Sequence, residues 1–220
     1  MPPRLTAVAI AAQWHGDPLG FSASLARFVV AAAPLGLTGA VVLRGHGLDR
    51  ATWRRALDRF GDVARVNGLR IGVSAGDPAD LAGAVAWLTE MAAAGADFLQ
   101  VPEHMAGRAL WKAARRAANC RVGLGTACHD TAGLDVAMQL FDWTWYSPVF
   151  ATPAKPDAAP LGLGRMGTAA AAYPRRIIAL GGIAAPEAPM CLAAGAVGVA
   201  SVRSAWTDPV GLVAAVRADL

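Results

Sequence analysis

The sequence predicts an α/β fold, a single (β/α)8 barrel that spans residues 1–220 as one domain. Three observations support this prediction. The length of 220 residues suits one such barrel. Short apolar runs alternate with longer helical runs eight times along the chain. Most of the short runs are apolar without interruption, as expected for parallel strands that are covered on both faces.

Each expected strand is followed by an expected helix. In the first half, we expect strands at 5–12, 39–45, 69–74 and 97–101, with helices near 21–33, 51–66, 78–94 and 105–118. In the second half, we expect strands at 120–125, 142–147, 176–182 and 197–202, with helices near 130–140, 165–172, 186–194 and 209–218. The repeated AGA tripeptide before the fourth and eighth strands suits a helix that ends at glycine.

The main alternative fold is a doubly wound parallel sheet. Such a sheet usually carries a glycine-rich fingerprint directly after its first strand. Residues 11–20 read AAQWHGDPLG, which is not that fingerprint. The sequence therefore favours the barrel.

Composition excludes several classes of function. The net charge of +4 comes mostly from arginine, since Lys112 and Lys155 are the two lysines, and no dense basic run with aromatic residues suggests nucleic-acid binding. No apolar run reaches the roughly 18 residues of a membrane span, so we expect no membrane association and a cytoplasmic location. Cys120, Cys128 and Cys191 form no CxxC pair, which predicts buried free thiols.

Polar residues gather where the expected strands end, and this end of a barrel carries the reactive groups. They include His15, Arg44, His46, Ser74, Asp77, Glu103, His104, Thr126, His129, Ser147, Thr152 and Lys155. All four histidines of the chain belong to this set. Their gathering at one end of the barrel favours a functional site there.

The seventh and eighth units carry a phosphate-binding pattern. Gly181 and Gly182 stand between the seventh strand and its helix, and a small-residue turn follows the eighth strand. Glycines let backbone N–H groups approach an anion closely, and this fold often binds phosphate after strands seven and eight. We therefore expect a phosphate at this place.

Four segments together resemble the thiamine phosphate synthase and thiazole tautomerase family of (β/α)8 barrels. They are GTACHD (125–130), DWTWYSPVFATPAKPDAAPLGLGRM (142–166), IIALGGI (177–183) and AGAVGVASVRSAW (194–206). Their order and spacing are those of the family, and the resemblance covers residues 120–206 well. In the first half, VVLRGHG (41–47) resembles the family's second-strand arginine segment.

The resemblance implies several binding roles. Thr152 and Lys155 match the threonine and lysine that hold a phosphate or pyrophosphate. Gly182 and the backbone around Val202 and Arg203 match the family's cradle for the thiazole phosphate. A lysine in this proline-rich loop would present its charge to the phosphate as a point charge.

The resemblance also implies roles for Arg44 and His129, whereas Thr126, Gly181 and Glu103 are candidates because they follow expected strands. Arg44 matches the basic residue near the pyrophosphate. His129 matches the histidine of the family's GxSxH motif, which moves protons in the tautomerase branch. Thr126 and Gly181 complete the candidate binding residues, while His129, Glu103 and Lys155 are the candidate catalytic residues.

The chain departs from the synthase pattern at the positions implied to bind Mg²⁺. The third strand runs into IGVSAGDP without the family's Asn-Asp pair, and Met105 stands about where the metal-binding Asp is expected. His46 replaces a lysine, and Ala127 replaces the serine of GxSxH. Mg²⁺ needs hard oxygen ligands, so losing two carboxylates should weaken its binding.

The main hypothesis is therefore a tautomerase-like isomerase that acts on a small phosphorylated thiazole and needs no cofactor. His129 would move the proton, because an unperturbed histidine side chain gains and loses a proton near neutral pH, and Glu103 or His104 would be a second acid or base. The family tends to dimerise, so we expect a homodimer.

Three alternatives stay open. One is a thiamine phosphate synthase, a transferase that joins an aminopyrimidine pyrophosphate to thiazole phosphate and uses Mg²⁺ at an altered site. Another is a non-catalytic protein that binds a phosphorylated ligand. A less favoured one is a metal-dependent hydrolase that uses His15, His46, His104 and His129, although the H-x-H motif after the first strand and an Asp after the last are missing.

Overall fold

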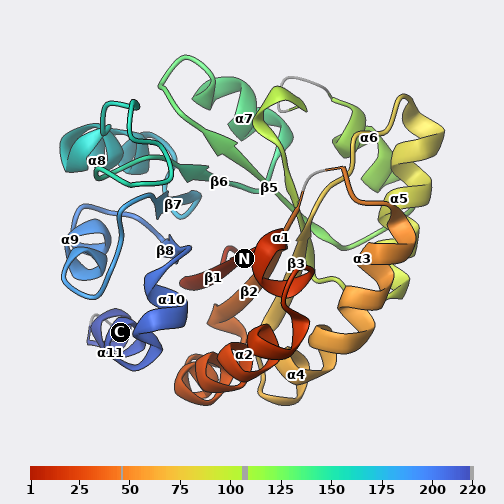
Figure 1. The fold of residues 1–220 in the computed structure, drawn as a ribbon. Helices are drawn as coiled ribbons and strands as arrows, with labels where there is room; N and C mark the ends of the chain where they lie inside the picture. Colours follow the sequence, from red (N-terminus) through yellow and green to blue (C-terminus); the bar gives the residue numbers. More distant parts are fainter. Residues whose placement is uncertain (46, 106–108, 219–220) are drawn as a thin grey trace.

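A computed structural model describes residues 1–45, 47–105 and 109–218. Eight parallel strands close into one barrel in chain order, and helices surround it (Figure 1). The strands are β1 (Leu5–Ile10), β2 (Gly39–Arg44), β3 (Arg70–Ser74), β4 (Phe98–Val101), β5 (Gly123–Cys128), β6 (Trp143–Tyr146), β7 (Ile177–Leu180) and β8 (Gly198–Ser201). The predicted (β/α)8 barrel is confirmed, and the doubly wound sheet is excluded.

The helices alternate with the strands as predicted. They are α1 (Ala11–Trp14), α2 (Pro18–Ala32), η1 (Ala33–Thr38), α3 (Arg50–Ala56), η2 (Leu57–Gly61), α4 (Asp62–Val66), α5 (Leu81–Ala93), η3 (Glu103–Met105), α6 (Leu110–Ala117), α7 (Leu134–Leu140), α8 (Gly162–Ala172), α9 (Glu187–Ala193), α10 (Ser204–Thr207) and α11 (Pro209–Arg217). The α3, η2 and α4 segments follow one another without a break and fill the predicted helix at 51–66.

Aspartates fix where four of these helices begin. The carboxylates of Asp17, Asp49, Asp80 and Asp208 each accept a hydrogen bond from the backbone N–H three residues further on. Such a cap satisfies one of the N–H groups that the first turn of a helix leaves without a partner. The sequence therefore determines the starts of α2, α3, α5 and α11 locally.

Each observed strand differs from its expected range by at least one residue, and the first, fifth and seventh differ most. The first strand ends at Ile10 because α1 begins directly after it. The fifth strand covers Gly123–Cys128, so the prediction of 120–125 was wrong by three residues. Asn119 takes a left-handed backbone conformation with φ 46° after α6, and the chain then needs Cys120 to Val122 to reach the barrel. In the resulting register, Gly125 pairs with Gln100 of β4.

Large aromatic side chains fill the inside of the barrel. Phe98, Trp143 and Trp145 point inward and are almost completely buried. Inward glycines make room for them, since a side chain on Gly72 would overlap the ring of Phe98 and one on Gly123 would overlap the indole of Trp143. Pairing of large with small residues across the barrel is how such an interior reaches close packing.

A second apolar layer lies between the barrel and its helices. The helix α2 contributes Phe21, Leu25 and Phe28, which are buried against the outer faces of the strands. Residues 18–36 are also long and apolar enough, by length and composition alone, to cross a membrane. In the barrel, this apolar character serves to bury one face of α2.

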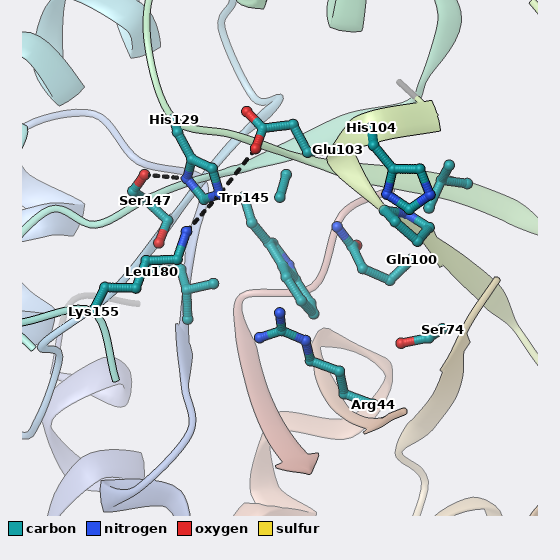
Figure 2. Close-up of a pocket in the computed structure, with 13 residues that line it drawn as sticks. Arg44, Ser74, Gln100, Glu103, His104, His129, Trp145, Ser147, Lys155 and Leu180 are labelled. Atoms are coloured by element: carbon teal, nitrogen blue, oxygen red, sulfur yellow. Dashed lines mark hydrogen bonds and ion pairs between the residues drawn. The ribbon is translucent and has the colours of Figure 1, made fainter. Parts of the chain in front are cut away.

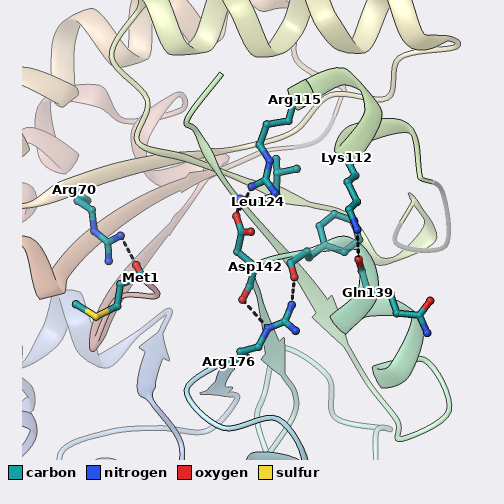
Figure 3. A network of polar contacts seen from close by, with 9 residues as sticks. Met1, Arg70, Lys112, Arg115, Leu124, Gln139, Asp142 and Arg176 are labelled. Atoms are coloured by element: carbon teal, nitrogen blue, oxygen red, sulfur yellow. Dashed lines mark hydrogen bonds and ion pairs between the residues drawn. The ribbon is translucent and has the colours of Figure 1, made fainter. Parts of the chain in front are cut away.

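Charged residues join the elements at the amino-terminal end of β6 (Figure 3). The carboxylate of Asp142 accepts hydrogen bonds from Arg115 of α6, over 2.5 Å, and from the backbone N–H of Leu124 in β5, over 2.8 Å. Arg176, just before β7, donates to the backbone carbonyls of Phe141 and Asp142. Three units of the barrel are thus held together at the end opposite to the predicted site.

Candidate active site

The carboxyl ends of the strands surround a hollow of about 310 Å³. We call it the inner hollow. Seven polar or aromatic side chains of its lining matter for its chemistry: Arg44, Ser74, Gln100, Glu103, His129, Trp145 and Lys155. Four of these stand at the last inward positions of β2, β3, β4 and β6, because alternate residues of a strand face the same side. The other three follow β4, β5 and β6, as Figure 2 shows.

The ring of His129 is fixed by a carbonyl group. Its Nδ1 lies 2.5 Å from the backbone oxygen of Ser147. A carbonyl oxygen can only accept a hydrogen bond, so Nδ1 carries the proton. In the neutral ring, Nε2 is therefore the basic nitrogen, and it faces the inner hollow (Figure 2).

Two charged side chains meet at this basic nitrogen. The Nζ of Lys155 lies 2.8 Å from Nε2, and the carboxylate of Glu103 lies 3.1 Å from it. When His129 is neutral, Lys155 can donate a hydrogen bond to Nε2. When His129 is protonated, Nε2–H can donate to Glu103 instead. The three candidate catalytic residues thus form one cluster that can take up and release a proton at Nε2.

Arg44 brings a positive charge to the inner hollow from β2. Burial lowers the pKa of its guanidinium, which nevertheless stays charged. Among the residues that the structure describes, none forms a hydrogen bond or ion pair with this guanidinium. A half-buried cation without a protein partner at the mouth of a barrel is suited to an anionic ligand.

A second hollow of about 320 Å³ adjoins the first and shares Leu180 with it. We call it the outer hollow. Its walls include Thr152, Gly181, Gly182, Ser201, Val202, Arg203 and Ser204. The two glycines have φ values of 98° and 67°, a left-handed conformation that favours glycine. A side chain on Gly182 would come within 2.5 Å of the carbonyl oxygen of Ala151, so the loop after β6 can pack closely there.

The structure brings together all but one of the predicted site residues. Thr126 is the exception, because the three-residue shift of the fifth strand places it inside β5 on the outer face of the barrel. It is completely buried there, and its hydroxyl donates to the carbonyl of Val101. The prediction that Thr126 binds phosphate is therefore not supported by its position.

Three of the seven lining residues named above were not predicted as site residues. They are Ser74, Gln100 and Trp145. The polar Gln100 interrupts an apolar strand, and the two-residue period of a strand could have identified it as inward-facing. Among the other histidines, His104 lies 3.6 Å from Asp77, and His15 contacts Trp14 beside a separate groove. His46 lies outside the described residues.

The residues at the mouth do not fit a protein-bound Mg²⁺ ion. In the described ranges, no three histidine, cysteine or acidic side chains are placed to hold a metal. The two acidic residues nearest the expected positions, Asp77 and Glu103, each pair with a histidine. Met105, at the position of an expected aspartate, is buried and apolar. The departures noted in the sequence therefore persist in three dimensions.

Comparison with known proteins identifies the family. The chain matches the thiamine monophosphate synthase family over residues 16–205. It is 31% identical over 158 residues to a Geobacter sulfurreducens protein named as a candidate thiamine-phosphate synthase. The match covers 71% of this chain and 64% of that relative, so the chain aligns with less than two thirds of the relative's length.

Solved structures establish the fold independently. A thiamine phosphate pyrophosphorylase from Pyrococcus furiosus superposes with a TM-score of 0.69 at 16% identity, over 99% of this chain and 96% of that one. A tryptophan synthase from M. tuberculosis superposes with a TM-score of 0.66 at 17% identity, over 98% and 93% of the two chains. Such likeness concerns the fold alone, whereas the sequence match is specific: the chain belongs to the thiamine monophosphate synthase family.

Proposed function

We propose that the protein is a thiamine phosphate synthase, which joins an aminopyrimidine pyrophosphate to a thiazole phosphate. The proposal rests mainly on one observation, that the inner and outer hollows adjoin at Leu180. Each hollow is suited to one phosphorylated substrate. The inner hollow offers the cations Arg44 and Lys155, and the outer hollow offers the glycine-lined wall. Family membership favours this transferase over the tautomerase that the sequence analysis preferred.

The reaction needs one bond to form and one to break. The thiazole ring nitrogen attacks the methylene carbon that carries the pyrophosphate on the pyrimidine. A C–N bond forms, the C–O bond breaks, and pyrophosphate leaves with the electron pair. The thiazole nitrogen becomes positively charged in the product, so no proton is lost and no oxidant is needed.

The residues of the two hollows have distinct roles in this reaction. Arg44 and Lys155 hold the pyrophosphate and stabilise the negative charge that it gains on leaving. The backbone of Gly182 and Val202, with the side chains of Thr152 and Arg203, holds the thiazole phosphate. Placing both substrates in adjoining hollows converts their encounter into a reaction within one complex.

The test is product formation by the purified protein. Both substrates and Mg²⁺ are mixed with it, and thiamine phosphate is measured through its oxidised fluorescent derivative. We expect product, and at least tenfold less of it with Arg44→Met at limiting pyrophosphate substrate. Arg54→Met, a change at an exposed arginine of α3, is the matched control and should leave the rate unchanged. No product from a folded wild-type protein would reject this function.

A second function is favoured by the cluster at His129. A thiazole tautomerase needs a phosphate anchor and a group that removes a proton from one ring position and returns it at another, which makes the ring aromatic. The basic Nε2 between Lys155 and Glu103 suits that proton transfer. This isomerase would need no cofactor.

The variant His129→Asn distinguishes the two functions. An asparagine N–H can still donate to the carbonyl of Ser147, but it has no basic nitrogen. Tautomerase activity should fall about 10²- to 10⁴-fold, the usual contribution of a general base. Synthesis of thiamine phosphate, which needs no such base, should change far less. Saturable binding of thiazole phosphate without either activity would instead indicate a binding protein.

A further inference from the structure

The floor of the inner hollow holds a buried amide without a partner. Gln100 points inward from β4, and its side chain is 6% exposed. Neither its Oε1 nor its Nε2 forms a hydrogen bond with any residue that the structure describes. Buried polar groups in proteins are almost always paired, because leaving them unpaired costs free energy. An orphaned amide in a hollow is therefore suited to pair with a ligand.

Further unpaired polar groups surround this amide. The indole of Trp145 is 2% exposed and lines the same hollow, and its Nε1 has no hydrogen-bond partner among the described residues. Ser74 of β3 stands opposite Gln100 in the strand register and also lines the hollow, without a hydrogen bond between the two side chains. In Figure 2, these side chains lie around one space, with the guanidinium of Arg44 next to it. A ligand with polar edges could satisfy several of them together.

The position of the amide depends on a glycine of the adjacent strand. A side chain on Gly125 would lie 2.6 Å from Oε1 of Gln100, so any larger residue there would displace the amide. The strand register pairs Gly125 directly with Gln100. The glycine thus leaves space for the side chain of Gln100. An apolar residue in place of Gln100 would fill the same space and would leave no polar group without a hydrogen bond.

The geometry of an amide limits which ligands it can pair with. Gln100 presents an acceptor and a donor side by side. This pattern complements a ring nitrogen next to an exocyclic amino group, the edge through which glutamine and asparagine recognise adenine. The cation of Arg44 on β2 adds attraction for an anionic substituent on the same ligand.

We propose that Gln100 is a specificity-determining residue, which recognises the edge of an aminopyrimidine formed by a ring nitrogen and its neighbouring amino group. The proposal rests on the proposed synthase function and adds to it the residue that selects the amino-substituted ring. The expected selectivity is on the order of 10- to 100-fold, the discrimination of a good bidentate pair.

The test measures binding without turnover. The probes are 4-amino-2-methylpyrimidine-5-methanol and 2-methylpyrimidine-5-methanol, which lacks only the amino group, and their dissociation constants are measured by titration. The wild type should bind the amino probe at least tenfold more tightly. Gln100→Met keeps the size of the side chain without its polar atoms, and it should abolish this preference. Gln139→Met, on the exposed side of α7, is the matched control and should keep it.

A second variant and a second ligand make the test decisive. Gln100→Leu also removes the oxygen that would accept a hydrogen bond from the amino group, so it should lose the preference for the amino probe as well. Neither change should alter binding of thiazole phosphate in the outer hollow. A preference that persists in both folded variants, or that is absent from the wild type, would overturn the role of Gln100. Formation of thiamine phosphate from the two phosphorylated substrates, measured in a separate assay, would then show that the synthase function stands. No product in that assay, together with no binding of thiazole phosphate, would reject both proposals.

Discussion

The indole Nε1 of Trp14 donates a hydrogen bond to the backbone carbonyl of Arg44 over 3.2 Å. Trp14 ends α1, directly after β1, and its ring packs against Trp53 of α3 with 5.0 Å between centroids. The backbone of Arg44, whose side chain is the candidate anion-binding group, is thus held in place by Trp14 of the first strand–helix unit.

Trp14→Phe should weaken binding of the pyrophosphate substrate without removing any charge. The change leaves the Arg44 carbonyl without its donor, so we expect stability to fall by about 1–3 kcal/mol and KM for that substrate to rise. Trp87→Phe is the control, because Nε1 of Trp87 is buried without a partner. Urea unfolding and steady-state kinetics measure both effects. Equal KM values for the two variants would contradict this positioning role.

Arg44→Met should make the ligand-free protein more stable although it impairs function. The half-buried guanidinium is desolvated and has no described partner, so an apolar side chain of similar length should be tolerated better there. We expect the melting temperature to rise by a few degrees in the absence of ligand. A lower melting temperature would mean that the guanidinium has a stabilising partner.

Gly72→Ala should destabilise the barrel, because the new methyl group would overlap the ring of Phe98. Overpacking of this kind costs about 1–3 kcal/mol. Gly164→Ala, in α8, meets no atom within 4 Å and should instead stabilise the protein by about 0.5–1 kcal/mol. Chemical denaturation of both variants tests the prediction, and a destabilisation of similar size in both would refute it.

Asp142→Asn should lower stability, since the carboxylate binds both Arg115 and the backbone of Leu124. We expect a loss of about 1–3 kcal/mol, the range for hydrogen bonds to charged groups. Asp62→Asn is the matched control: its pair with Arg65 is exposed and should contribute at most about 1 kcal/mol. Thermal or urea unfolding distinguishes the two, and the ranking fails if Asp62→Asn costs more.

Stability should fall in alkaline solution partly because of Cys191. Burial raises the pKa of this thiol to about 12, whereas a cysteine in the unfolded chain ionises near pH 8.5. The folded state therefore keeps a proton that the unfolded state releases, and this contribution is present below about pH 8.5 and lost progressively towards pH 12. The unfolding free energies of wild type and Cys191→Ala should converge between pH 8.5 and 10.5. Parallel curves would exclude the thiol as the cause.

The barrel itself was predictable because eight apolar runs alternate with helical runs, a pattern that few other folds share. The position of β5 was not, because the turn at Asn119 and the exposed Arg121 lie beside apolar residues that resemble a strand start. This error put Thr126 at the mouth, whereas it faces the helices. Gln100 was overlooked although it is the polar residue of an otherwise apolar strand, and the two-residue period of β4 could have marked it. His129 and Lys155 were found because motifs mark them, and Glu103 because it follows an expected strand, but their mutual contacts could come only from the fold.

The aromatic residues inside the barrel also determine by which end a ligand can enter and leave it. The buried side chains of Phe98, Trp143 and Trp145 fill the interior below the inner hollow, so the described part of the barrel is closed towards its opposite end. Substrates and products must then share a single entrance at the carboxyl ends of the strands. If the proposed synthase function holds, departing pyrophosphate and the larger product would compete with incoming substrates for that entrance, and accumulated product would slow the reaction.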